Sequence, residues 1–242
     1  MKTSDKILIV SAILILILII FLATTAKHIA NHENSSFNIM KYSGNGKTVR
    51  REIPIDSFSG VSVNGGWEIE INSNDSNKFS VIMENPENEL SDIYYYLYSG
   101  IFTVRYRSGL FYKGNMQEGI HKISISMPKL SSLEFSGGTK ASFSGFKSAK
   151  LGIIVSGGCN LKGKDNAINN IVIKSSGASH IDLNESSVTN ADLDTSGVSF
   201  IELNMAGGNL TGSASGVSSI LYSGNIRSQN VKQSGVVNIV KR

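Results

Sequence analysis

The sequence has very little cysteine, proline or tryptophan: one cysteine, three prolines and one tryptophan among 242 residues. A single cysteine, Cys159, excludes an intramolecular disulfide and a cysteine-rich metal site, so we expect a small core residue at that position. So few prolines do not suggest a disordered linker protein. The net charge is only +4 and like charges do not gather in blocks, so we expect no nucleic-acid partner.

Catalytic and cofactor motifs are also absent from the sequence. It has no zinc signature, no calcium-binding nonapeptide repeat and no phosphate-binding loop. It has no G-x-S-x-G turn of the kind that presents a nucleophilic serine. We therefore expect no metal ion, no cofactor and no catalytic residue, and we predict that the protein is not an enzyme.

One apolar run dominates the N-terminal end: residues 7–26, ILIVSAILILILIIFLATTA, carry no charge. A helix of about 20 apolar residues can cross the ~30 Å hydrocarbon core of a membrane. Lys2 and Lys6 precede the run, which favours a cytoplasmic N-terminus and an extracytoplasmic location for the rest of the chain. We predict a transmembrane signal anchor over residues 1–26, with a cleaved signal peptide as the alternative. Residues 27–49 are polar and are predicted to form a linker.

Glycine is plentiful, and much of it is periodic. Six Ser-Gly pairs follow one another at intervals of 20, 20, 20, 19 and 19 residues. Their serines are Ser136, Ser156, Ser176, Ser196, Ser215 and Ser234. Ser176 also lies close in sequence to His180 and Asp182, the residue types of a catalytic triad. Because Ser176 is one of six equivalent serines, we interpret it as a structural repeat position and not as a nucleophile.

Each repeat shows the alternation of a half-buried β-strand. The fifth residue after the serine is apolar in every repeat: Ala141, Leu161, Ile181, Ile201, Ile220 and Ile239. Strands that return at this interval without helical patterning between them indicate a solenoid. The pattern of a leucine-rich repeat is missing, so we predict an all-β, right-handed parallel β-helix. Its coils should hold 19–20 residues, and Ile181, Ile201 and Ile220 should form one buried stack.

Residues 50–130, before the repeats, are predicted to contain strands at residues 61–71, 78–83, 94–106 and 121–128. Ser99–Gly100, inside the third strand, is typical of a hairpin turn. We interpret this section as the first coils and the cap of the same domain, because a terminal coil needs its edge covered. A separate β-sandwich is the alternative. The tyrosines within residues 94–98 either pack on one face or form a binding platform.

Several motifs of residues 50–242 resemble one known family. REIPIDSFSGVSVNGGWEIEI is followed by VIMENPENELSDIYYYLYSGIFTV, then by ISISMPKLSSLEFSGGTKASF and the recurrent SGASHIDL. In this order they are similar to the head domain of autotransporter adhesins, the GIN domain. The resemblance implies an extracytoplasmic β-helix domain over residues 50–242, with the Ser-Gly repeats at 131–242. Later repeats replace Ala178 by Val198, Val217 and Val236, and we expect these changes to leave the packing intact.

A candidate binding site follows from the strand alternation, which turns the fourth and sixth residues after each serine outward. Lys162, Asp182 and Glu202 then lie in one line on consecutive coils, with His180 beside them. Grouped carboxylates and cations on the outer face of a β-helix suit the binding of carbohydrate or a cation. The alternative is a solvated charge ladder without a ligand.

Two classes of function remain open from the sequence. We predict a membrane-anchored, extracytoplasmic module that binds polysaccharide or protein along its repetitive face. A carbohydrate-active lyase or hydrolase on the same scaffold is the alternative, but such an enzyme should interrupt the repeats with a cleft, and these repeats contain no insertion. The last repeat, GVVNIVKR, has no evident cap, so its edge is a candidate for self-association, limited by Lys241 and Arg242.

Overall fold

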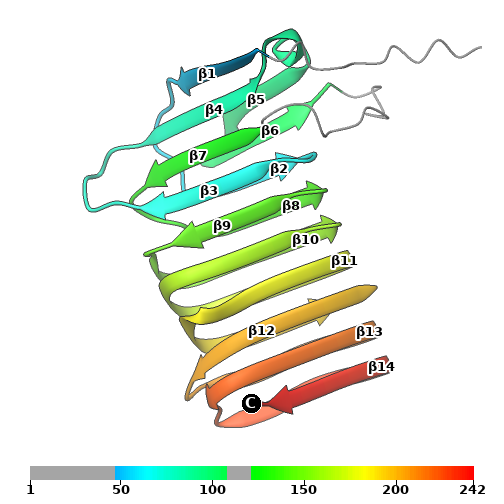
Figure 1. The fold of residues 1–242 in the computed structure, drawn as a ribbon. Helices are drawn as coiled ribbons and strands as arrows, with labels where there is room; N and C mark the ends of the chain where they lie inside the picture. The colour runs from blue at the N-terminus through cyan, green and yellow to red at the C-terminus, as the bar shows by residue number, and fades with distance from the viewer. Residues whose placement is uncertain (1–46, 108–120) are drawn as a thin grey trace, which may run out of the picture. The chain divides into compact units, whose positions relative to one another are not determined.

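The computed structural model describes residues 47–107 and 121–242, and Ser43–Arg242 form one compact unit. The predicted membrane segment, residues 7–26, and most of the predicted linker lie outside the described residues. Within the described ranges, no helix has the length and apolar character needed to cross a membrane. These ranges are built almost entirely of β-strands (Figure 1), which confirms the all-β class.

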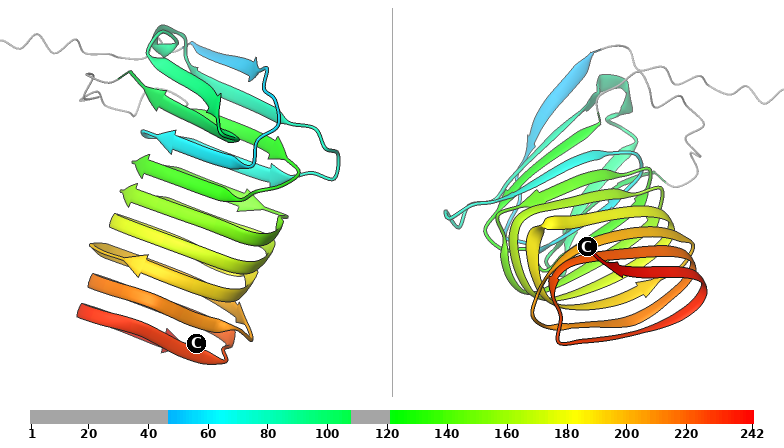
Figure 2. Two further views of the ribbon diagram at one scale, coloured as in Figure 1. Left: turned by 180° about the vertical axis from the view of Figure 1, so that it is seen from behind. Right: turned by 60° about the horizontal axis from the view of Figure 1, so that its bottom comes forward.

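The strands fall into an N-terminal group and a repeat group. The N-terminal group holds a single 3-10 turn, η1 (Glu87–Glu89), and the strands β1 (Thr48–Ile53), β2 (Gly60–Asn64), β3 (Glu68–Ser73), β4 (Ser80–Pro86), β5 (Ile93–Tyr98), β6 (Ile101–Tyr106) and β7 (Lys122–Met127). The repeats form β8 (Ser132–Gly137), β9 (Lys140–Ser144), β10 (Lys147–Gly157), β11 (Asn160–Thr195), β12 (Val198–Ala206), β13 (Asn209–Asn225) and β14 (Ser228–Lys241). The longest strands continue around the corners of the coil (Figure 2).

Successive repeats stack as parallel coils, so the solenoid prediction is confirmed. The pairing of β10 with β8 and β11 sets Ser136, Ser156 and Ser176 side by side. The register shifts along β11: Ala178 lies beside Val198 of β12, twenty residues on, whereas Ala191 lies beside Leu210 of β13, nineteen residues on. The two intervals in the sequence therefore correspond to two coil lengths.

The core is a stack of apolar side chains inside the coils. Ile181, Ile201 and Ile220 are neighbours in the register and each is 0% exposed, which confirms the predicted stack. Complete burial of one such side chain contributes about 1.5–3 kcal/mol. Ile239, next in the column, is only partly buried, because β14 pairs with β13 alone among the described strands.

At the N-terminal end the coils do not follow sequence order. β2 lies between β6 and β8, and β3 lies between β7 and β9. The chain forms the β2–β3 coil, leaves it through β4 and β5, adds the β6–β7 coil on one side and returns to the other side at β8 (Figure 1). The return is fixed by Ser131, whose backbone N–H and hydroxyl both donate to the carbonyl oxygen of Ser59, at 2.7 and 3.0 Å.

One strand boundary differs from the prediction. The single strand expected over residues 61–71 is wrong: the chain turns a corner at Gly65, with φ = +122°, and forms β2 and β3. Apolar alternation continues on both sides of the corner, so the sequence pattern does not mark it. The segment expected over 94–106 is the β5–β6 hairpin, turned at Ser99 and Gly100, which have φ values of 50° and 73°.

The N-terminal group holds a buried polar pair. Nε2 of His121 lies 2.6 Å from Oε2 of Glu89, and the two side chains are 7% and 4% exposed. The indole of Trp67 contacts the edge of His121 and stacks on Tyr106, with ring centroids 5.7 and 5.5 Å away. This cluster joins η1 to the residue that precedes β7.

Candidate functional site

Each Ser-Gly pair forms a tight corner between two strands of a coil. The glycines of these pairs have positive φ: Gly137, Gly157, Gly177, Gly197, Gly216 and Gly235. A Cβ atom on Gly177 would lie 2.7 Å from the backbone nitrogen of Gly157. The corner therefore needs glycine both for its left-handed backbone and for the close stacking of coils.

The residue three positions after each serine points inward at this corner. Ser179 and Ser199 are buried, and the hydroxyl of Ser175 hydrogen-bonds to both, at 2.9 Å to Ser199. Ser218 donates to the carbonyl oxygen of Ser215 at 3.0 Å. The buried hydroxyls therefore find hydrogen-bond partners within the corner, either in one another or in the backbone.

A groove runs along the outside of these corners, across successive coils. Its volume is about 590 Å³, and we call it the corner groove. Three valines stay exposed in it: Val198 is 59%, Val217 54% and Val236 72% exposed. Apolar side chains that remain in water in a continuous line make the corner groove a candidate interaction surface.

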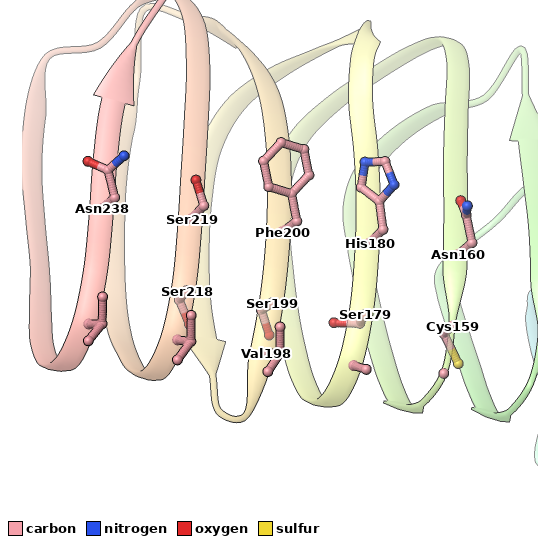
Figure 3. Close-up of a pocket in the computed structure, with 14 residues that line it drawn as sticks. Cys159, Asn160, Ser179, His180, Val198, Ser199, Phe200, Ser218, Ser219 and Asn238 are labelled. Atoms are coloured by element: carbon pink, nitrogen blue, oxygen red, sulfur yellow. The ribbon is translucent and has the colours of Figure 1, made fainter.

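One wall of the corner groove is formed by the fourth residue after each serine. Figure 3 shows Asn160, His180, Phe200, Ser219 and Asn238 in a row, one on each coil. His180 and Phe200 meet edge to face, with ring centroids 5.0 Å apart. The groove lining contains no Lys, Arg, Asp or Glu, so its surface is apolar on one side and neutral and polar on the other.

The structure brings two of the predicted site residues together beside the groove. Nε2 of His180 lies 3.6 Å from Oε1 of Glu202. This distance is too long for a hydrogen bond and short enough for an ion pair when the imidazole is protonated. The His180 side chain is 42% exposed and also belongs to the groove wall.

Glu202 is less exposed than its outward position suggests, because two residues that the sequence did not relate to it cover it. Nη1 of Arg242 donates to Oε2 of Glu202 at 2.6 Å, and the amide of Asn184 donates to the same oxygen. The Glu202 side chain is only 12% exposed. Arg242 and Glu202 are 40 residues apart, so no local sequence signal relates them.

The remaining two predicted site residues have other partners. Asp182 lies beside Glu202 in the register, and its Oδ1 accepts a hydrogen bond from the backbone of Asn184 at 3.0 Å. Lys162 contacts Glu185 at 2.6 Å. The hydrogen bond between these two exposed groups raises the pKa of Lys162 and lowers the pKa of Glu185.

The valine column is the functional feature that sequence reasoning missed. The sequence predicts that replacement of Ala178 by Val198, Val217 and Val236 leaves the packing intact, but it does not predict that these valines are solvent-exposed and line the groove. The available signal was their position, directly after a glycine that forces a left-handed corner. A side chain at that point projects from the corner and not into the core.

Comparison with known proteins gives the family. The family model described as "Putative auto-transporter adhesin, head GIN domain" matches residues 57–203, more than half of the chain. The chain belongs to this family. No protein of curated description matches the chain in sequence.

Two solved structures share the fold of this GIN domain. A "putative adhesin" from Bacteroides fragilis is 15% identical with a TM-score of 0.60, covering 83% of this chain and 99% of that one. A "putative lipid binding protein" from Parabacteroides distasonis is 17% identical with a TM-score of 0.52, covering 82% of this chain and 98% of that one. Neither name, nor the family description, is that of an enzyme.

The described part of the GIN domain contains no cluster of three or more His, Cys, Asp or Glu side chains able to hold a metal ion. Its one cysteine, Cys159, is buried and its thiol donates to the carbonyl oxygen of Ser156 at 3.2 Å. Burial raises the pKa of the Cys159 thiol. The residue is a small corner residue, like the serines of its column.

We expect the buried thiol of Cys159 to be unreactive in the folded protein. Its alkylation by iodoacetamide should be at least about tenfold slower than in denaturant, because the reactive thiolate is disfavoured and covered. The rate is measured by mass spectrometry. As control, Ser213→Cys in a Cys159→Ser background places a thiol at an exposed position and should react quickly. Equal rates for the two thiols would contradict the burial of Cys159.

Proposed function

We propose that this GIN domain is an extracytoplasmic adhesion module that binds a linear, neutral polysaccharide in the corner groove, parallel to the solenoid axis. The proposal rests on the valine column, which keeps Val198, Val217 and Val236 in water on successive coils. The unbroken repeat supports a binding surface that extends along the molecule and not an enclosed reaction site.

The groove matches the chemistry of a sugar chain. A sugar ring has apolar faces and hydroxyl edges, so it can lie on the valine floor and hydrogen-bond to the amide groups of Asn160 and Asn238. Phe200 adds an aromatic surface. Adjacent coils are ~4.8 Å apart, about the length of one pyranose residue, so successive sugars can occupy successive coils. The lack of charged lining residues favours a neutral chain.

The four residues predicted from the sequence enter this proposal in different roles. We propose that His180 contacts the ligand from the groove wall and that Glu202 positions the imidazole from behind. Lys162 and Asp182 would form a charged rim outside the groove. The contact of His180 with Phe200 supports this, because it orients both rings along one wall.

We further propose that the domain works outside the cytoplasm, attached to a membrane through residues 7–26. The uncharged run and the two preceding lysines support this. The adhesin name of the family and of one structural neighbour is consistent with display at a cell surface. In this arrangement the compact unit of residues 43–242 would present the groove to the exterior.

The proposal is tested with the fragment 43–242, which contains the complete compact unit. Binding is measured to an array of linear neutral oligosaccharides, including cello-, xylo- and manno-oligosaccharides, and every hit is checked for cleavage products by chromatography. The double variant Val198→Asn/Val217→Asn should bind at least about tenfold more weakly, because two apolar contacts are lost. His180→Ala should weaken binding in the same assay.

The matched control is Val240→Asn, which changes another exposed valine, 40% exposed, that does not line the groove. It should leave binding unchanged. Equal loss in both variants, or no neutral glycan bound at all, would overturn the proposal. Cleavage of a bound glycan would instead support the alternative function, that of a carbohydrate-active enzyme. Binding of phospholipid vesicles by the groove in place of glycans would replace it with lipid binding.

A further inference from the structure

A second surface lies on the β5–β6 ribbon, at the edge of the sheet. β5 pairs with β6 alone among the described strands. Its tyrosines are exposed: Tyr94 42%, Tyr95 41%, Tyr96 42% and Tyr98 74%. An edge strand is usually protected by charge or cover, yet this one presents four aromatic rings to solvent.

Two arginines, Arg105 of β6 and Arg107 just after it, share the face of three of these tyrosines. Alternation places Tyr94, Tyr96 and Tyr98 on one side of β5, and Arg105 lies opposite Tyr94 in the register. The guanidinium carbon of Arg105 is 5.4 Å from the centre of the Tyr96 ring, and that of Arg107 is 5.9 Å from the Tyr94 ring. We call these five residues the tyrosine–arginine face.

The face is positively charged and has little acidic compensation. Neither β5 nor β6 contains an Asp or Glu. Asp92 precedes β5, and its carbonyl oxygen accepts the backbone N–H of Arg107 at 2.8 Å. Each guanidinium group lies close to a tyrosine ring. Both arginines are also exposed, so their N–H groups remain available for an anionic partner.

The outward surface that continues from this face along the solenoid is polar and meets an exposed carboxylate at β8, where Glu134 lies beside Ser62 and accepts a hydrogen bond from its hydroxyl at 3.4 Å. Thr103 of β6 lies beside Ser62 of β2 in the register, and Asn64 of β2 donates to Ser136 of β8 at 2.7 Å. An acidic polymer held at the tyrosine–arginine face could therefore extend over β6 and β2, as far as Glu134. This continuity favours a long, flexible ligand over a small ion.

We propose that the tyrosine–arginine face binds an acidic polysaccharide, one whose sugars carry carboxylate groups. Arginine recognises a carboxylate with two parallel N–H···O bonds, and tyrosine rings pack on the apolar faces of sugars while their hydroxyls stay hydrated. This site is separate from the corner groove: it lies on β5 and β6, whereas the groove begins at Gly158 and is neutral.

The test measures binding of the fragment 43–242 to polygalacturonate and alginate by titration calorimetry at low and high salt. The double variant Arg105→Gln/Arg107→Gln should bind at least about tenfold more weakly, because two charge-assisted contacts are lost. Tyr96→Ser/Tyr98→Ser should weaken binding too. Wild-type binding should weaken at high salt, since exposed charges are screened.

The matched control is Lys147→Gln/Lys150→Gln, which removes the same charge from two exposed lysines outside the ribbon. Unchanged affinity of the arginine variant, or equal losses in both double variants, would overturn the proposal. Binding to phosphatidylglycerol vesicles without binding to polyuronate would replace it with a membrane surface. Binding of neutral glycans, and its loss in the Val198→Asn/Val217→Asn variant, tests the groove alone. Each of the two proposals can therefore be contradicted without affecting the other.

Discussion

Replacing His121 with alanine is expected to lower the free energy of unfolding by about 3–5 kcal/mol, because it leaves the buried Glu89 side chain without its partner. Glu89 would keep a carboxylate in a site that is 4% exposed, without the imidazole at 2.6 Å. The truncation also removes a ring that contacts Trp67. We expect the N-terminal cap to be the first part of the solenoid to open.

The effect is measured by urea denaturation, followed by the fluorescence of Trp67, the single tryptophan of the chain. Arg50→Ala is the control, because its contact with Glu84 at 3.9 Å is exposed and such a pair is worth about 0–1 kcal/mol. A double replacement, Glu89→Met/His121→Phe, should recover much of the loss by removing both polar groups. A loss in His121→Ala no larger than in Arg50→Ala would contradict the importance of the pair.

Replacing Gly177 with alanine is expected to cost about 2–5 kcal/mol, from a left-handed backbone and a forced overlap together. Gly177 has φ = +86°, and its new Cβ would lie 2.7 Å from the nitrogen and 2.8 Å from the oxygen of Gly157. These are backbone atoms of the preceding coil, which cannot rotate away. Circular dichroism during thermal unfolding should show a lower melting temperature of the coils.

Two other glycines separate the causes. Gly207 has φ = +88° but no atom within 4 Å of a Cβ, so Gly207→Ala should show the backbone cost alone, about 1–2 kcal/mol. At Gly138 a Cβ would also meet nothing within 4 Å and φ is not in the left-handed range, so Gly138→Ala should change stability by less than about 0.5 kcal/mol. Equal effects at Gly177 and Gly207 would show that the stacked corners can separate without cost.

These predictions concern two parts of the fold that the sequence revealed to different degrees. The stacked corners follow from the Ser-Gly interval, and the column of Ile181, Ile201 and Ile220 was identifiable from the sequence alone. The pairing of His121 with Glu89 was not, because the two residues are 32 positions apart in a section without repeats. Periodicity reports contacts that recur, whereas a contact made once leaves no pattern.

The sequence likewise predicted some features of the candidate sites and not others. The sequence placed His180 on an outer face, in the column that forms the groove wall. It could not indicate that Lys162 contacts Glu185 or that Arg242 covers Glu202. A long charged side chain can pair with any of several neighbouring groups, and the free energies of such pairs are similar. The only sequence signal for the exposure of Val198 is the preceding Gly197, whose left-handed conformation turns the valine side chain away from the core.

The sequence by itself determined the all-β class, the coil length and the buried isoleucine stack, because each depends on an interval of 2 or of 19–20 residues, and it showed the resemblance to the GIN family through the order of its motifs. Only the tertiary structure decided the position of the β2–β3 coil between later strands, the exposed valines of the corner groove and the arginines stacked on the tyrosines. The first depends on pairing between strands that are not consecutive in the sequence, and the other two depend on the direction in which side chains leave a corner or a hairpin.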